Sequence, residues 1–252
     1  MDNLFRGKSN LNTPIIHIEN LFYHYPDSKQ GINEVNLSIH SGESVALVGE
    51  NGSGKSTLLL HLNGILQASR GTVKIANLII NNKNLKEVRH KVGMVFQNSD
   101  DQLFMPTVYD DVAFGLLNLG IEGPELEKKI NHALERVGML HLKDRPPYKL
   151  STGEKRAISI ATILAMEPDI LIMDEPSANL DPHSRRRLIH LLNSFEHTKI
   201  IATHDLDMAL DICPRTVVLH QGKISADSNT FDIFKNKEIL EQSNLEPPLK
   251  WQ

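Results

Sequence analysis

The sequence has a single cysteine, Cys213, and no long apolar run. One cysteine cannot form an internal disulfide bond, so we expect a reducing compartment. No stretch reaches the roughly 18–20 apolar residues that cross a membrane as a helix. The N-terminus also lacks the apolar segment of a secretory signal. If the protein works at a membrane, we expect it to do so through a partner.

Aromatic residues and positive charge are also scarce. Aromatic residues make up 5% of the chain, and the formal net charge is -4. This charge argues against a nucleic-acid partner and against direct attachment to anionic lipid. The basic run Arg185-Arg186-Arg187 lies in a helical stretch, where a solvated face is the expected interpretation. The rest of the composition is typical of a globular protein, and 252 residues suffice for one large domain with a subdomain.

Apolar runs typical of strands occur in two groups. The first group comprises residues 15–25, 32–40, 44–49 and 71–80, and the second comprises 169–174, 199–204 and a hairpin over 216–226. Between the groups, the stretch of about 98–168 shows helical periodicity. The order predicts an α/β fold with a parallel core sheet and a helical insertion. Two amphipathic pieces follow residue 230.

The segment "GENGSGKS" at 49–56 matches G-x-x-x-x-G-K-[ST], follows a predicted strand and opens a predicted helix. Glycines let backbone N–H groups turn inward around phosphates, and the helix N-terminus adds a positive dipole. Lys55 would reach the β- and γ-phosphates, Ser56 would offer its hydroxyl to Mg²⁺, and Thr57 would assist at the α-phosphate. The similar letters "RGKS" at 6–9 lack the strand and the helix, so we do not assign them this role.

A second segment supplies acids for the metal ion. "ILIMDEP" at 170–176 is an apolar strand that ends in Asp174 and Glu175. Asp174 would hold the Mg²⁺ shell, and Glu175 would orient or activate the attacking water. Taken alone, the two acids would be interpreted as a solvated strand end. The phosphate-binding loop upstream favours the catalytic interpretation.

A third segment, "LSTGE" at 150–154, is a second candidate anion site at a helix start. One loop reaches the phosphates from one side only, whereas phosphoryl transfer also needs charge stabilisation from the opposite side. Ser151, Gly153 and the helix dipole could supply it if they came from a second subunit.

In this order the motifs resemble those of ATP-binding cassette (ABC) ATPases along nearly the whole chain. "ILIMDE" resembles the Walker B strand with its catalytic glutamate, and "LSTGE" resembles the signature that faces ATP on the opposite subunit. "GENGSGKST" resembles the Walker A loop, so the resemblance implies ATP contacts by Gly49, Glu50, Asn51, Gly52, Ser53, Gly54, Lys55, Ser56 and Thr57.

Four weaker motifs complete the resemblance. Gln97 resembles the Q-loop glutamine, which reaches Mg²⁺ and water and senses a membrane partner. Asp181 resembles the D-loop aspartate at a dimer seam, and His204 resembles the switch histidine at the γ-phosphate. Tyr25 resembles the aromatic that stacks on adenine. The resemblance implies Mg²⁺ ligation by Ser56, Gln97 and Asp174, and catalytic roles for Lys55, Gln97, Glu175 and His204.

The resemblance also implies a fold and cofactors. We expect a P-loop NTPase (RecA-like) core with an N-terminal antiparallel β subdomain and an inserted α-helical subdomain. The ABC ATPase domain would cover 14–230, with the helical subdomain at about 98–168, and a C-terminal helical tail would cover 231–252. ATP and Mg²⁺ are the expected cofactors.

Three positions depart from the family pattern. Thr152 stands where the signature usually has glycine, and a β-branched residue does not readily adopt a positive φ. Gly153 and Ser151, which the γ-phosphate contact needs, are both present, so we expect a working site, with slower turnover left open. Glu154 replaces a common glutamine, and Asn179 stands where a small residue is common.

The segment 96–120 and the late "LEPPL" at 245–249 resemble the ATPases of energy-coupling-factor (ECF) importers, the cobalt and nickel type especially. That family places two ATPases at the cytoplasmic face of the cell membrane, as peripheral subunits. Their partners are a transmembrane coupling (T) component and a small substrate-binding membrane (S) component. A helix start in the same segment predicts Asp100 or Asp101 as its N-cap.

Several alternatives stay open. Cobalt or nickel is the favoured cargo, and a vitamin such as biotin, riboflavin or thiamin is the alternative. A dimer with itself is mildly favoured over a dimer with a paralogous ATPase, because both halves of a composite site are intact. A soluble ABC ATPase is disfavoured by the acidic charge and by the lack of a coiled-coil insertion. A binding module without turnover is disfavoured by the presence of Lys55, Glu175 and His204.

Overall fold

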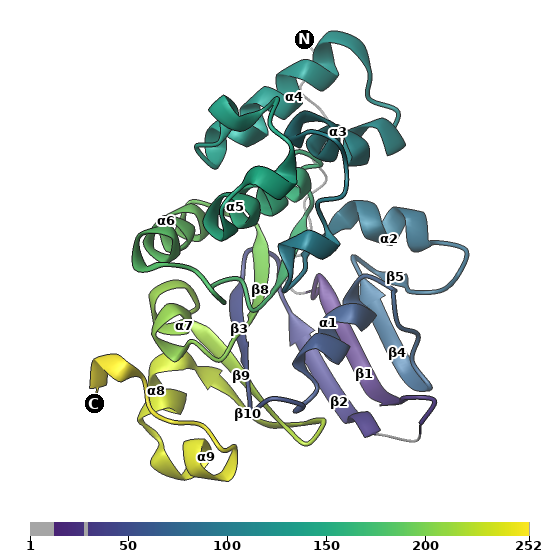
Figure 1. The fold of residues 1–252 in the computed structure, drawn as a ribbon. Helices are drawn as coiled ribbons and strands as arrows, with labels where there is room; N and C mark the ends of the chain where they lie inside the picture. The colour runs from purple at the N-terminus through teal and green to yellow at the C-terminus, as the bar shows by residue number, and fades with distance from the viewer. Residues whose placement is uncertain (1–12, 28–29, 252) are drawn as a thin grey trace, which may run out of the picture.

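The computed structural model describes residues 13–27 and 30–251, which form two sheets and the helices around them (Figure 1). The letters at 6–9 lie outside the described residues. The strands are β1 (Ile16–His24), β2 (Gln30–Ile39), β3 (Ser44–Val48), β4 (Arg70–Ile75), β5 (Leu78–Ile79), β6 (Val92–Val95), β7 (Ile170–Asp174), β8 (Thr198–Ala202), β9 (Arg215–His220) and β10 (Lys223–Asn229). The α-helices are α1 (Lys55–Leu62), α2 (Leu85–Lys91), α3 (Val108–Asn118), α4 (Gly123–Arg136), α5 (Thr152–Leu164), α6 (Pro182–Asn193), α7 (Leu206–Ile212), α8 (Thr230–Lys235) and α9 (Lys237–Gln242).

The first sheet is antiparallel and has the order β2-β1-β4-β5. This sheet is the N-terminal subdomain expected from the resemblance. The prediction of one strand over 71–80 was wrong, because the chain turns back at Ala76 and Asn77. Both residues have positive φ, 46° and 68°, which suits the twist of a two-residue hairpin. A turn without glycine inside an apolar run gave no sequence signal.

The second sheet has the order β10-β9-β3-β8-β7-β6. Its strands β6, β7, β8, β3 and β9 are parallel, and only β10 is antiparallel, joined to β9 by the predicted turn at Gln221 and Gly222. Every residue of β7 and β8 is buried, as expected for inner strands of a parallel sheet, although β8 begins with Thr198 and Lys199 and β7 ends in Asp174. Since parallel strands end at one edge, the segments that follow β3, β7 and β8 meet there.

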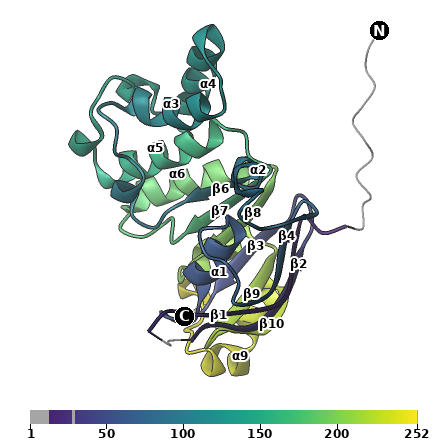
Figure 2. The ribbon, with the colours of Figure 1, turned by 90° about the vertical axis from the view of Figure 1, so that its right-hand side faces the viewer.

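Helix α1 lies between the two sheets (Figure 2). Leu58, Leu59 and Leu62 of α1 belong to one buried cluster with side chains of both sheets, among them Ile16 and Ile172. Burial of these apolar side chains fixes α1 against the core. The loop that precedes α1 is thereby held at the edge where β3 and β7 end.

Helices α3, α4 and α5 form the inserted helical layer, which stands to one side of the sheets in Figure 2. Val112, Leu116, Ile130, Leu134 and Ile158 fill its centre and are fully buried. The sequence did not predict the short helix α2, which buries only Val88.

The predicted cap at Asp100 or Asp101 was wrong. A short 3-10 helix, η1 (Ser99–Asp101), lies in that segment, and Asn98 caps it by accepting the N–H of Asp100. The turn begins at Ser99, so the residue before it, Asn98, takes the capping role two positions before Asp100.

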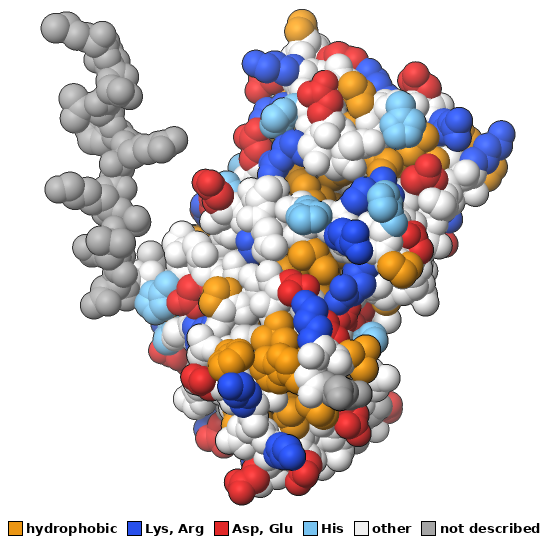
Figure 3. All heavy atoms as spheres, turned by 90° about the vertical axis from the view of Figure 1, so that its left-hand side faces the viewer, with side chains coloured by type: hydrophobic (Ala, Val, Ile, Leu, Met, Phe, Trp, Pro, Cys, Tyr) orange, Lys and Arg blue, Asp and Glu red, His pale blue; other side chains and the backbone are white. Residues whose placement is uncertain are grey.

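The C-terminal residues pack on the core. Ile233, Phe234 and Leu240 belong to the cluster beneath the second sheet and are buried. Farther on, the Asn244 side-chain amide donates to Glu50 Oε2 at 2.9 Å. Figure 3 shows apolar side chains gathered beside basic side chains on this part of the surface.

The last described residues attach to α7. The backbone N–H groups of Leu249 and Lys250 both donate to the Asp207 carboxylate, each at 3.1 Å. The Lys250 ammonium pairs with Asp211 at 2.5 Å. Among the helices of residues 13–27 and 30–251, none is both long and apolar enough to span a membrane.

Candidate active site

A cleft of about 460 Å³ opens at the edge where β3 and β7 end. The four predicted catalytic residues, Lys55, Gln97, Glu175 and His204, all line it. Other predicted site residues that line it are Tyr25, Asn51, Gly52, Gly54, Ser56, Thr57 and Asp174. Asp27 and Gly31 also line the cleft, and no motif had singled them out.

The glycine-rich loop has the backbone that its sequence predicts. Gly49, Gly52 and Gly54 have φ of 155°, 82° and 109°, in the region that favours glycine. A Cβ on Gly54 would lie 2.7 Å from the Gly31 carbonyl oxygen, which leaves no room for a side chain. Such consecutive turns aim backbone N–H groups at one point, as a phosphate-binding loop requires.

The Lys55 ammonium lies across this loop. Its Nζ donates to the carbonyls of Gly49 at 2.8 Å and Glu50 at 3.1 Å. Burial lowers the pKa of Lys55, and the negative charges of Glu175, Asp174 and Glu50 oppose that shift. A triphosphate would add negative charge beside a partly desolvated ammonium, so the loop is suited to ATP.

The strand end carries oxygen ligands that suit Mg²⁺. Asp174 is buried, and burial raises its pKa, whereas a hydrogen bond from Ser56 and the charge of Lys55 lower it. In the described part of the chain, Oδ1 of Asp174 is buried without a hydrogen-bond partner. A carboxylate oxygen beside a serine hydroxyl is a donor set that Mg²⁺ accepts.

Glu175 and His204 form a contact across β7 and β8. His204 Nδ1 lies 2.8 Å from Glu175 Oε2, and the His204 N–H donates to the same oxygen at 3.2 Å. Glu175 has φ of 45°, an unusual conformation for a non-glycine residue, and its N–H donates to the Ala202 carbonyl at 2.8 Å. A buried carboxylate held in a fixed orientation can act as a general base.

Tyr25 and Gln97 border the cleft from opposite subdomains. The Tyr25 hydroxyl hydrogen-bonds to Thr57 Oγ1 at 2.7 Å, and its ring meets Tyr23 edge-on at 5.0 Å. Gln97 follows β6 and is exposed at the cleft. Both residues therefore lie at the cleft, and their contacts with adenine and with a metal-bound water stay predictions.

The rest of the predicted site lies elsewhere. Three residues of the loop, Gly49, Glu50 and Ser53, do not line the cleft. The Glu50 carboxylate instead accepts a hydrogen bond from the Asn244 amide, and its Oε1 lies 3.4 Å from His220 Nδ1. The Ser53 hydroxyl is buried without a partner in the described residues.

Ser151, Gly153 and Asp181 form a separate group outside the cleft. A Cβ on Gly153 would lie 3.0 Å from Ser184 Cβ, so glycine permits the close approach of α5 to α6. Asp181 caps α6 by accepting the N–H groups of His183 and Ser184. Ser151, Gly153 and Asp181 thus lie together, outside the cleft that the Lys55 loop lines.

The structure removes the concern about Thr152. Thr152 is the first residue of α5 and adopts the helical conformation, so no positive φ is required there. Ser151 and Glu154 form a capping box around it, in which the Ser151 N–H donates to Glu154 Oε2 at 2.7 Å. Asn179 has φ of 61°, a conformation that asparagine tolerates well. The reason to expect slower turnover from Thr152 is therefore absent.

A glycine-rich loop with a lysine, two strand-end acids and a histidine around one cleft define a P-loop nucleoside triphosphatase. Comparison with known proteins gives the family. The ABC transporter family profile matches residues 32–178, and the chain belongs to this family.

Two relatives cover most of the chain. A protein of Geobacter sulfurreducens, named as an ABC transporter ATP-binding protein, is 54% identical over 238 residues, covering 94% of this chain and 96% of that protein. The energy-coupling factor transporter ATP-binding protein EcfA of Carboxydothermus hydrogenoformans is 46% identical, covering 93% of this chain and 87% of that protein.

Two solved structures share the fold. CbiO1 from Clostridium perfringens, described as part of the ABC transporter complex cbiONQ, has a TM-score of 0.81 and 39% identity over 92% of this chain and 95% of that chain. The ATP-binding cassette MJ0796, in a dimeric post-hydrolysis state with ADP and Pi, has a TM-score of 0.78 and 26% identity over 85% of this chain and 98% of that chain.

These findings confirm the predicted fold class and the resemblance to ABC ATPases. The chain is an ATPase subunit that uses ATP and Mg²⁺, and it is similar to the ATPases of ECF-type and CbiO-like transporters. The roles of the individual site residues stay predictions.

Proposed function

We propose that this chain is the motor subunit of an ECF-type importer, in which it powers solute uptake by hydrolysing ATP. The observation that carries the proposal is the Lys55–Asp174–Glu175–His204 cleft in a chain whose relatives include proteins named EcfA. The similarity to CbiO1, part of an ABC transporter complex, supports it further.

Hydrolysis is assigned to the residues of the cleft. Lys55 and the loop bind the phosphates, and Tyr25 stacks on the adenine. Ser56, Gln97 and Asp174 would hold Mg²⁺, which would supply positive charge beside the phosphate oxygens. Glu175 orients the attacking water and accepts its proton, and Nδ1 of His204, 2.8 Å from Oε2, keeps that carboxylate in place.

The complete site is assigned to a dimer. Ser151, Gly153 and Asp181 lie together outside the cleft, so they complete the site of a second ATPase subunit. Their serine hydroxyl and helix N-terminus then stabilise the transferred phosphoryl group from the far side. A second copy of this chain is the preferred partner, and a paralogous ATPase is the alternative.

The helical subdomain is assigned to the membrane partner. Phe104 is 63% exposed, and Phe114 and Leu117 of α3 are also exposed. The rings of Phe104 and Phe114 meet edge-on at 5.2 Å, so the apolar surface is continuous. Such surface on a chain of net charge -4 suits a protein partner, here the T component with its S component. The chain would then be a peripheral subunit at the cytoplasmic face of the membrane.

The domain division follows the same assignment. The ABC ATPase domain covers 14–230 with the helical subdomain at about 98–168, and the helical tail covers 231–252. For the cargo, cobalt or nickel is preferred because the segment 96–120 resembles the cobalt and nickel type of ECF ATPase, and biotin, riboflavin or thiamin is the alternative. A soluble ABC ATPase without a transport role is the least favoured function.

Co-purification tests the proposal. The Glu175→Gln variant, tagged and bound to ATP and Mg²⁺, should retain a T component from solubilised native membranes. One S component and no second ATPase would support a dedicated importer with a homodimeric motor. A second ATPase with several S components would favour the vitamin alternative. Recovery without any membrane protein would contradict the transport role.

A surface variant makes this test specific. Phe104→Glu should abolish co-purification while the isolated chain keeps its ATPase activity. Ile79→Glu is the matched control, since Ile79 is 49% exposed but lies on β5 of the other subdomain. Equal loss from both substitutions would count against a docking site formed by Phe104 and α3.

A further inference from the structure

Arg156 connects the signature helix to the Q-loop. It lies in α5, five residues after Ser151, and is only 4% exposed. Its Nη1 donates to the Phe96 carbonyl at 2.6 Å, and its Nη2 donates to the Gln97 carbonyl. The buried guanidinium thus binds backbone carbonyls, and no ion pair to it occurs among the described residues.

Gln102 supplies a second connection between the same two segments. Its Oε1 accepts the Phe96 N–H at 3.2 Å. Its Nε2 donates to the Ser159 carbonyl at 2.7 Å and to Thr162 Oγ1 at 2.8 Å, both on α5. Phe96 therefore has its N–H bonded to Gln102 and its carbonyl bonded to Arg156.

The need for these contacts follows from the topology. Strand β6 is at the edge of its sheet, and it pairs only with β7 in the described chain. The strand ends at Val95, so no ladder holds Phe96 and Gln97. Hydrogen bonds from α5 replace the missing ladder at the point where Gln97 enters the ATP cleft.

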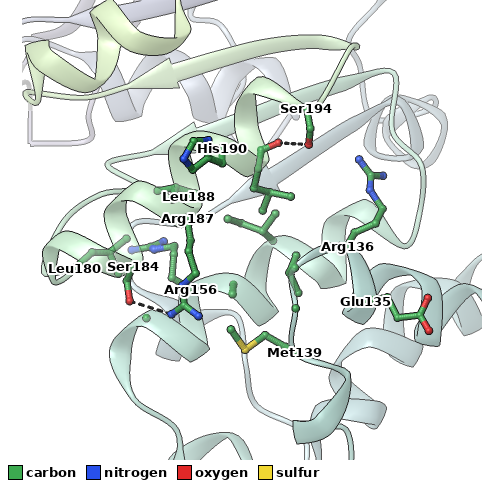
Figure 4. A pocket seen from close by; sticks show the side chains of 16 residues that line it. Glu135, Arg136, Met139, Arg156, Leu180, Ser184, Arg187, Leu188, His190 and Ser194 are labelled. Carbon is green, nitrogen blue, oxygen red and sulfur yellow. Dashed lines mark hydrogen bonds between the residues drawn. The ribbon is translucent and has the colours of Figure 1, made fainter.

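A hollow in the surface lies beside Arg156 and the first turns of α5. It measures about 440 Å³ and lies between the end of α4, α5 and α6, with Arg156 and Gly153 in its lining (Figure 4). Ile160, Ile163 and Leu164 pack α5 against the core farther along the helix. The hydrogen bonds of Arg156 to Phe96 and Gln97 hold the first turns of α5, beside this hollow.

We propose that Arg156 is a positioning residue, which fixes the backbone of Gln97 at the ATP cleft and makes the Q-loop move together with α5. This inference rests on the proposed role of Gln97 at Mg²⁺ and water. Loss of the two hydrogen bonds would let the Gln97 side chain leave its position. The loop around Lys55 would be unaffected, so ATP binding would persist while hydrolysis slowed.

A double-mutant cycle in the full chain tests this. Arg156→Met should lower kcat about 10- to 100-fold, the range expected for a misplaced catalytic group, while the KM for ATP stays within about threefold. Arg156→Lys, which keeps the positive charge and one donor nitrogen, should restore part of kcat. Combining Arg156→Met with Gln97→Ala should lower kcat no further than Gln97→Ala alone.

A matched control separates positioning from general damage. Asp100→Ala breaks the Lys155–Asp100 ion pair, which also joins α5 to this segment but whose aspartate is 64% exposed. It should leave kcat unchanged. If Arg156→Met does not fold, as judged by thermal unfolding, Gln102→Leu takes its place in the cycle with Gln97→Ala.

Three outcomes would overturn the inference. The first is a kcat of the double variant that falls by the product of the two single losses. The second is an effect of Arg156→Met on KM for ATP rather than on kcat. The third is a full effect of Gln97→Ala with no effect of Arg156→Met. If Gln97→Ala itself leaves kcat unchanged, the proposed role of Gln97 fails first, and the inference fails with it.

Discussion

Nδ1 of His204 lies 2.8 Å from Oε2 of Glu175, and the backbone N–H of His204 donates to the same oxygen at 3.2 Å. Strands β7 and β8, which are adjacent and parallel, deliver the two residues to one edge. The carboxylate is buried, whereas the imidazole is 65% exposed. The contact therefore joins an enclosed acid to a side chain that solvent or a ligand can reach.

Replacing the carboxylate should separate binding from turnover. Glu175→Gln keeps the size of the side chain but removes the base, so we expect turnover to fall by about 10²–10⁴. ATP binding should persist, and size-exclusion chromatography with ATP should show a dimer. The exposed Glu87→Gln is a control and should match the parent. A variant that stays monomeric with ATP would count against a self-complementary pair.

Removing the Lys55 ammonium should abolish ATP turnover. Lys55→Ala deletes the charge that lies across the loop, and it removes a positive charge that acts on Asp174 and Glu175. Phosphate release should drop to background, and ATP titration should give a weaker Kd. Lys83→Ala, on the exposed turn before α2, should have no effect. Retained turnover would contradict the assignment of the loop.

Substitution of Thr152 should have little effect on the reaction. Since Thr152 begins α5 in the helical conformation, Thr152→Gly relieves no strain. We expect the steady-state ATPase rate to stay within about twofold, with the thermal midpoint lowered slightly because glycine weakens a helix. A collapse in rate would mean that the threonine side chain has a role in the signature that its position does not explain.

The capping box should give a pH-dependent stability. Hydrogen bonds from the Ser151 N–H and hydroxyl to Glu154 lower the pKa of that carboxyl. Because the pKa of Glu154 is lower in the folded protein than the value of about 4.3 in the unfolded chain, the charged carboxylate stabilises the fold at any pH above about 4.3. This stabilisation is lost as the pH falls through the pKa of the folded protein. Glu154→Ala should therefore unfold about 2–4 °C below the parent at pH 7, and the gap should shrink below about pH 4.

Glu154→Gln is the control for this prediction. The amide is neutral at every pH and still accepts a hydrogen bond. Its difference in midpoint from Glu154→Ala should therefore not change with pH in differential scanning fluorimetry. A gap between Glu154→Ala and the parent that persists at pH 3 would show that the charge is not involved.

Local patterns in the sequence were enough to predict the centre of the site. The loop 49–56, the strand end at Asp174 and the histidine after β8 all follow parallel strands, and such strands end at one edge. The cleft-lining residues Lys55, Glu175 and His204 could thus be named before their distances were known.

Long-range polar contacts could not be predicted in the same way. The contact of Arg156 with Phe96 spans 60 residues, and that of Asn244 with Glu50 spans 194. Neither pair belongs to a motif, and their partners are backbone or short polar groups that many residues could supply. The positive φ of Glu175 likewise depends on the contact with Ala202 rather than on local propensity.

Trp251 is the only tryptophan in the sequence. Its ring meets Phe231 edge-on at 5.4 Å and is 39% exposed, and the preceding residue, Lys250, is hydrogen-bonded to Asp207 of α7. Helix α7 begins two residues after His204. The protein therefore carries its own fluorophore, joined through one short helix to the catalytic edge. Changes in indole emission would follow movements of that edge in the unlabelled chain.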